Sequence, residues 1–108
     1  MFQEGSLFWA TIPEDPKKEP RACVVTCAPP YSTSVVEVVY GQEKPHGPHV
    51  YRVEPKSELG KALGLSKTTH FCSRTELYVS LVTDQKKPLC PPLDFIAISA
   101  IAEKQRLD

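Results

Sequence analysis

The stretch "EGSLFWATIPEDPKKEPRACVVTC", residues 4–27, holds two apolar runs separated by a loop of proline and charged residues. Leu7–Ile12 and Ala22–Cys27 each have the length of a strand and are bounded by turn-forming residues. Apart from Thr26, Ala22–Cys27 carries no polar side chain, which is typical of a central strand that is buried on both faces. The stretch therefore predicts two strands at the start of a mainly β fold.

The composition of the whole chain sets limits on its architecture and partners. Its 108 residues predict one domain spanning residues 1–108, and its 11 prolines, mostly in clusters, argue against long helices. Thirteen Lys and Arg side chains balance 13 Asp and Glu side chains. Because the net charge is zero, the chain has no general electrostatic affinity for nucleic acid, and any phosphate site must be local.

The remaining segments are also short. We expect a third strand over Val35–Gly41, a half-exposed edge strand at 50–54, one or two helical turns between an N-cap at Ser57 and a stop at Gly64, and two strands or one bent strand within 67–83. Five or six short strands with one or two small helices in a chain of this length predict a small, strongly bent barrel.

The tail, residues 93–108, has a mixed pattern. Apolar side chains follow the helical spacing i, i+3, i+4, i+7 and i+8 at Leu93, Ile96, Ala97, Ala100 and Ile101. We predict a strand-like entry that passes into a C-terminal helix, with Glu103, Lys104 and Arg106 in contact with solvent.

The cysteines, histidines and apolar segments predict a protein of a reducing compartment that binds no metal. Three residues separate Cys23 from Cys27, and seventeen separate Cys72 from Cys90, so neither pair has the spacing of a zinc knuckle. His46 and His49 lie in a loop of proline and glycine, where solvated side chains are the simpler expectation. We find no signal peptide and no segment long enough to span a membrane. We therefore expect free thiols, no metal, no membrane and a cytoplasmic location.

Four motifs, in order, resemble the MazF/PemK-like toxin family. They are "GSLFWATIP", "RACVVTC", "VVEVVYGQ" and "LGLSKTTHF", and together they cover about residues 4–82. The resemblance implies an SH3-like barrel, a homodimer, and cleavage of single-stranded RNA without a metal or another cofactor. It also implies an antitoxin or another protein as partner.

In that family an arginine entering the second strand and a Thr or Ser at the end of the third strand carry the chemistry. Arg21 matches the arginine, whereas Gly41-Gln42-Glu43 stands where the hydroxyl is expected. Thr69 and Thr68 are the nearest hydroxyls that can stand in, and His70 is a candidate general base. The substrate-binding candidates are Tyr40, Gln42 and Lys67.

Two functions remain open from the sequence. The first is a toxin-like endoribonuclease, in which the planar guanidinium of Arg21 binds two oxygens of the scissile phosphate. The second is an inactive barrel of the same fold that binds a protein or nucleic acid, for example as a phage-encoded inhibitor. Arg21 also has a simpler interpretation as a loop-end arginine paired with Glu14, Asp15 or Glu19.

Overall fold

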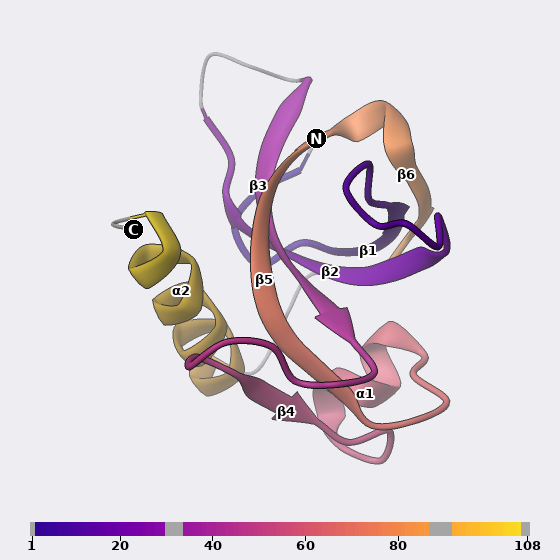
Figure 1. The fold of residues 1–108 in the computed structure, drawn as a ribbon, viewed down its shortest axis with the longest axis vertical. Helices are drawn as coiled ribbons and strands as arrows, with labels where there is room; N and C mark the ends of the chain where they lie inside the picture. The colour runs from indigo at the N-terminus through magenta and orange to yellow at the C-terminus, as the bar shows by residue number, and fades with distance from the viewer. Residues whose placement is uncertain (1, 30–33, 87–91, 107–108) are drawn as a thin grey trace.

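The computed structural model describes residues 2–29, 34–86 and 92–106, which form a mainly β structure (Figure 1). In chain order the elements are β1 (Leu7–Thr11), β2 (Pro20–Cys27), β3 (Val35–Gln42), β4 (Tyr51–Val53), α1 (Glu58–Leu63), β5 (Thr69–Tyr78), the 3₁₀ turn η1 (Val79–Leu81), β6 (Val82–Gln85) and α2 (Pro92–Arg106). The mainly β class with a C-terminal helix is confirmed.

The strands form one antiparallel sheet in the order β4-β5-β3-β2-β1-β6. The sheet is not closed, since β4 and β6 are its two edges, but it curls strongly (Figure 1). The short turn η1 joins β5 directly to β6 at the far edge. The segment 67–83 thus forms one long strand, a tight turn and the start of a short strand.

Both faces of the sheet bury apolar side chains, and β2 contributes to each. Ala22 and Val24 pack under the helices with Phe71 and Ile98. Cys23 and Val25 point to the opposite side, into the hollow of the curled sheet, where Phe8, Val38 and Leu77 complete a second cluster. Residues 22–26 are all buried, which confirms the prediction of a strand buried on both faces.

The ends of α1 are fixed by the residues expected from the sequence. Ser57 is the N-cap, and its hydroxyl accepts a hydrogen bond from the Gly60 backbone N–H at 3.0 Å. Gly64 ends the helix in the left-handed conformation, with φ of 73°. The helix therefore has a defined length, and the loop that follows it begins at a fixed point.

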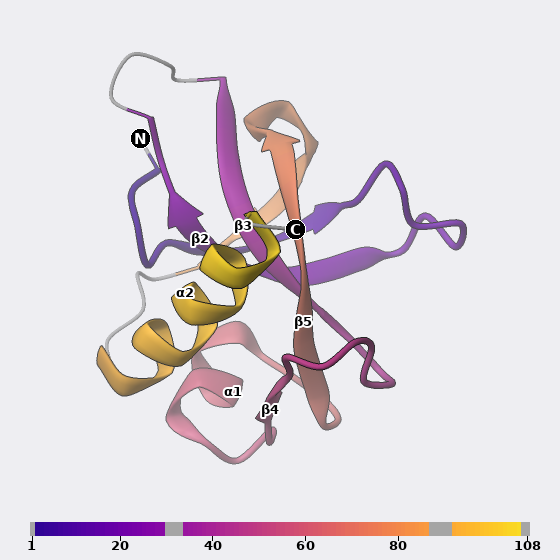
Figure 2. The same ribbon diagram turned by 60° about the vertical axis from the view of Figure 1, so that its left-hand side comes forward.

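The tail differs from its prediction at its start. It is helical from Pro92 onward, so the expected strand-like entry is wrong; proline suits the first turn of a helix because it has no N–H to leave unpaired. The buried side of α2 carries Ile98 and Ile101, whereas Leu93 and Ile96 are 75% and 63% exposed. Figure 2 shows α2 lying across the outer face of the sheet, where it packs against β2, β3 and β5.

Two polar side chains near the end of α2 fasten it to the sheet. The Gln105 amide accepts a hydrogen bond from the Arg74 backbone N–H at 2.7 Å and donates one to the Cys72 carbonyl at 2.6 Å. These two bonds pair backbone groups of β5 that lie beyond the reach of the three-residue strand β4. Arg106, which we expected only to contact solvent, donates to both carboxylate oxygens of Glu37 at 2.6 and 2.7 Å.

Glu37 on β3 is the centre of a buried ionic cluster. It is 6% exposed and also accepts hydrogen bonds from Arg74 Nε and Thr26 Oγ1, both at 2.6 Å. Burial alone would raise the pKa of this carboxyl group, but the bonds from Arg106, Thr26 and Arg74 outweigh it and lower the pKa to about 2. The cluster joins β2, β3, β5 and α2.

Other described residues show no further covalent or membrane feature. Cys23, Cys27 and Cys72 are free thiols, and Cys90 lies outside the described residues. Within residues 2–29, 34–86 and 92–106, no helix combines the length and apolar character needed to cross a bilayer.

We predict that Glu37→Gln lowers the free energy of unfolding by about 2–4 kcal/mol, because it leaves two arginines without their buried partner. Glu76→Gln is the matched control, since Glu76 lies 3.6 Å from Arg74 but is 70% exposed. Urea unfolding followed by circular dichroism measures both. Equal losses in the two variants would contradict a special role for Glu37.

The same cluster predicts a pH dependence of stability. The pKa of Glu37 falls from 4.5 to about 2 on folding, so its contribution is complete above pH 4.5 and is lost as the pH falls toward 2. The full contribution is about 3 kcal/mol. Unfolding near neutral pH and at about pH 3 should show a smaller acid-induced loss for Glu37→Gln than for the wild type. Identical losses would mean that Glu37 is not the titrating group.

Candidate functional site

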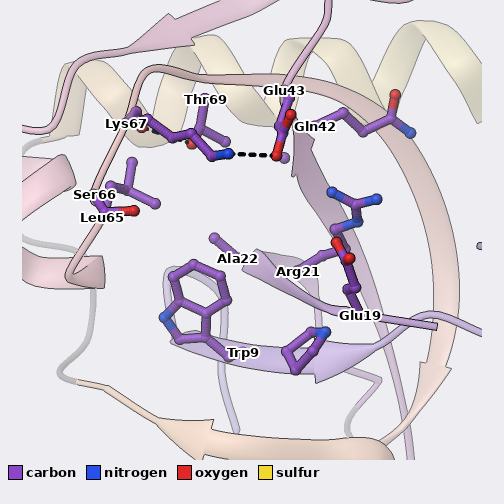
Figure 3. Close-up of a pocket in the computed structure, with 12 residues that line it drawn as sticks. Trp9, Glu19, Arg21, Ala22, Gln42, Glu43, Leu65, Ser66, Lys67 and Thr69 are labelled. Carbon is purple, nitrogen blue, oxygen red and sulfur yellow. Dashed lines mark hydrogen bonds and ion pairs between the residues drawn. The ribbon is translucent and has the colours of Figure 1, made fainter. Parts of the chain in front are cut away.

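A cavity of about 260 Å³ lies where β2 begins and β3 ends (Figure 3). Its walls come from Trp9 on β1, residues 19–22, residues 41–43, residues 65–67 in the loop that follows α1, and Thr69 at the start of β5. Of the sequence candidates, it brings together Arg21, Gln42, Lys67 and Thr69. These residues come from three separate parts of the chain and meet because antiparallel pairing places the start of β2, the end of β3 and the start of β5 side by side.

Arg21 is held in place by an acidic residue of the β1–β2 loop. Its Nε donates to Oδ2 of Asp15 at 2.8 Å, and the two side chains are 15% and 8% exposed. The other oxygen of Asp15 accepts from the Lys17 backbone N–H at 3.1 Å, so a tight turn aims the carboxylate. The bond raises the pKa of Arg21 and lowers the pKa of Asp15. The pairing with Asp15, one of the simpler alternatives, is therefore present.

The pairing with Asp15 leaves most of the Arg21 guanidinium available to bind a ligand. In the part of the chain that the structure describes, Asp15 is the one hydrogen-bond partner of the Arg21 guanidinium, and the bond uses Nε alone. The two Nη nitrogens keep their donors, and Figure 3 shows the guanidinium pointing toward Gln42 and Glu43 within the cavity. Asp15 thus fixes the orientation of Arg21 without covering the edge that binds two oxygens of a phosphate.

Thr69 occupies the space in which a side chain at position 41 would lie. A Cβ atom built on Gly41 would be 2.2 Å from Cγ2 of Thr69. The Thr69 hydroxyl donates to the Lys67 carbonyl at 3.2 Å. The hydroxyl that the family resemblance places at the end of β3 is missing there, and the first residue of β5 supplies one beside it.

Lys67 and Gln42 lie on the cavity rim. Lys67 forms an exposed ion pair with Glu43 at 2.6 Å, which lowers the pKa of that glutamate. The Gln42 amide donates to the Ser73 hydroxyl at 3.4 Å. The cavity lining thus holds two cationic side chains, Arg21 and Lys67, and two carboxylates, Glu19 and Glu43.

Trp9 is the site residue that the sequence analysis did not identify. Its indole N–H donates to the Leu63 carbonyl at 2.7 Å, and its ring lines the cavity beside Ala22 (Figure 3). In the ladder Trp9 lies opposite Ala22, whose small side chain leaves the aromatic ring uncovered. Adjacent residues of a strand point to opposite faces of the sheet, so Phe8 and Trp9 cannot pack on the same side. This alternation was the sequence signal that could have separated Trp9 from the cluster around Phe8.

Three other candidates lie outside the lining of this cavity. The Thr68 hydroxyl donates to Glu54 at 2.8 Å, and His70 Nδ1 lies 3.0 Å from the Glu43 carbonyl oxygen. Tyr40 packs against the cluster inside the curled sheet, where burial raises the pKa of its hydroxyl. Among residues 2–29, 34–86 and 92–106, no three His, Cys, Asp or Glu side chains are grouped to hold a metal ion.

Comparison with known proteins adds no assignment. No protein-family model matches the chain, and no curated protein matches it. Functional inference therefore rests on the site itself and on the motifs in the sequence.

We predict that Gly41→Ala destabilises the fold by about 1–3 kcal/mol, because the new methyl group overlaps Cγ2 of Thr69. Thr69→Ser removes that methyl group and keeps the hydroxyl, so the cost of Gly41→Ala should be smaller in the Thr69→Ser background. A double-mutant cycle from thermal unfolding measures the coupling. Strict additivity would show that Thr69 does not fill this space.

Proposed function

We propose that this protein is a MazF/PemK-like endoribonuclease that binds single-stranded RNA in the Trp9–Arg21–Thr69 cavity and cleaves it without a metal. The observation that carries the proposal is Arg21, whose free Nη edge lies in a cavity with an aromatic wall. The order of the four sequence motifs and the curled β sheet with its C-terminal helix support it.

The proposed chemistry needs few groups. The ribose 2′ oxygen attacks the adjacent phosphorus, the bond to the 5′ oxygen breaks, and a proton passes from the 2′ oxygen to the leaving oxygen. Negative charge builds on the phosphate oxygens in the transition state, where the Nη donors of Arg21 stabilise it. Thr69 and Ser66 are the hydroxyl residues that line the same cavity, and Lys67 and Gln42 are placed to contact the backbone on the rim.

A second candidate is RNA binding without cleavage, and one observation favours it. Gly41 carries no hydroxyl, and the Thr69 hydroxyl is already bonded to the Lys67 carbonyl. Under this candidate Arg21 still binds phosphate, but no group assists the proton transfer. Cleavage and binding must therefore be measured separately.

We predict that Arg21→Lys lowers RNA cleavage in EDTA by about 10²–10³-fold and leaves the fold intact. Lysine keeps a positive charge beside the buried Asp15 but loses the edge that binds two oxygens at once. Arg52→Lys is the matched control, because Arg52 is an ion-paired arginine on β4 away from the cavity.

The outcomes separate the two candidates. Wild-type cleavage that Arg21→Lys removes supports the nuclease. Binding without cleavage, weakened by Arg21→Lys, supports the binding module. If the wild type neither binds nor cuts a long single-stranded RNA, both candidates are wrong.

The proposal includes a homodimer in the cytoplasm, with an antitoxin or other protein as a further partner. The exposed apolar side chains Leu93 and Ile96 on α2 give a surface for a second copy. We predict that Ile96→Lys converts a dimeric mass to a monomeric one and leaves the monomer folded, because this side chain is 63% exposed and contributes little to the monomer core. Light scattering at micromolar concentration measures the mass, and a monomeric wild type would contradict the dimer.

A further inference from the structure

A second cavity, of about 300 Å³, meets the first at Arg21. The two cavities share three lining residues, Arg21, Gln42 and Glu43. The second extends away from Trp9, between the β1–β2 loop at Asp15–Lys17 and the loop that follows β3. Arg21 therefore stands between two spaces, each larger than a single side chain.

The two cavities differ in chemistry. The first has an apolar wall of Trp9, Ala22 and Leu65, with the indole held by its bond to the Leu63 carbonyl. The second carries Lys17, Lys44 and His46 and no Phe, Tyr or Trp. Within the described ranges, neither Lys17 nor Lys44 forms an ion pair, in contrast to Lys67 on the first cavity.

We infer that one RNA strand lies across both cavities, with a phosphodiester group at Arg21, a base stacked on Trp9, and the neighbouring phosphate on the other side held by Lys17 and Lys44. The inference rests on the proposed RNA-binding function and adds to it the path of the RNA strand across the two cavities. On the Trp9 side the site requires a base, because a flat indole contributes through stacking. On the lysine side it requires only the charged backbone.

The first test measures how affinity depends on salt. The probe is a short 2′-O-methyl RNA of mixed sequence, which cannot be cleaved by 2′ attack, and binding is followed by fluorescence anisotropy. Each phosphate contact to a single strand contributes about 0.7 to the slope of log K against log salt, so Lys17→Ala/Lys44→Ala, which removes the contact to one phosphate, should reduce the slope by about 0.7. Lys56→Ala/Lys61→Ala, at exposed positions on or before α1, is the control and should leave it unchanged.

The second test removes single bases from the same RNA. An abasic position on one side of the Arg21 phosphate should weaken binding about 5- to 150-fold, and the neighbouring position on the other side should have little effect. Trp9→Leu should abolish the sensitive position, whereas Trp9→Phe, which keeps an aromatic face, should retain it. The abasic scan on the wild type needs no variant, so it decides the matter even if Trp9→Leu does not fold.

The results that overturn the inference are specific. Equal sensitivity at the two abasic positions, or an unchanged salt slope for Lys17→Ala/Lys44→Ala, removes the two-cavity arrangement and leaves RNA binding at Arg21 intact. Wild-type protein that does not bind the probe or a long RNA overturns the proposed function and this inference together.

Discussion

The three-residue turn η1 is the constraint on which the rest of the structure depends. It joins β5 to β6, yet β3, β2 and β1 lie between these strands in the sheet. Four inter-strand spacings in a flat sheet would separate them by about 19 Å, whereas even a fully extended path from Tyr78 to Val82 reaches about 14 Å. The sheet must therefore curl, and its inner face becomes a closed apolar cluster around Phe8 and Val38.

The antiparallel pairing within this sheet determines where chemistry can take place. It brings the start of β2, the end of β3 and the start of β5 to one end of the molecule, and Arg21, Gln42 and Thr69 meet there. The outer face would remain apolar and uncovered without α2. In the Glu37 cluster Arg106 of α2 shares the Glu37 carboxylate with Thr26 and Arg74 of the sheet, and these bonds hold the helix against the sheet. None of these residues lines the cavity. The ionic cluster that stabilises the fold and the candidate site thus lie in different parts of the sheet.

Local sequence patterns predicted most of the strands, because alternation, valine pairs and proline boundaries act within a few residues. Ser57 and Gly64 marked the ends of α1 for the same reason.

Long-range pairing was not predictable: Glu37 and Arg106 are 69 residues apart, and an arginine in a polar tail carries no sign of a buried partner. The buried side of α2 was left open by the sequence, because its apolar side chains do not form a single stripe and only the neighbouring sheet selects Ile98 and Ile101. In the site, Arg21 was found from its motif, but Trp9 was not identified, because exposure of one ring face depends on Ala22 in the adjacent strand.

The central claim is that Arg21 and Trp9 form one RNA-binding site. The most direct measurement is a titration of ¹⁵N-labelled protein with a short 2′-O-methyl RNA, followed by ¹H–¹⁵N correlation spectra. The account predicts that the Trp9 indole N–H, the Arg21 Nε–H and the backbone amides of residues 41–43 and 66–69 shift together, with one dissociation constant. Shifts confined to the exposed side of α2 around Leu93 and Ile96, or no shift at Trp9 and Arg21, would contradict it.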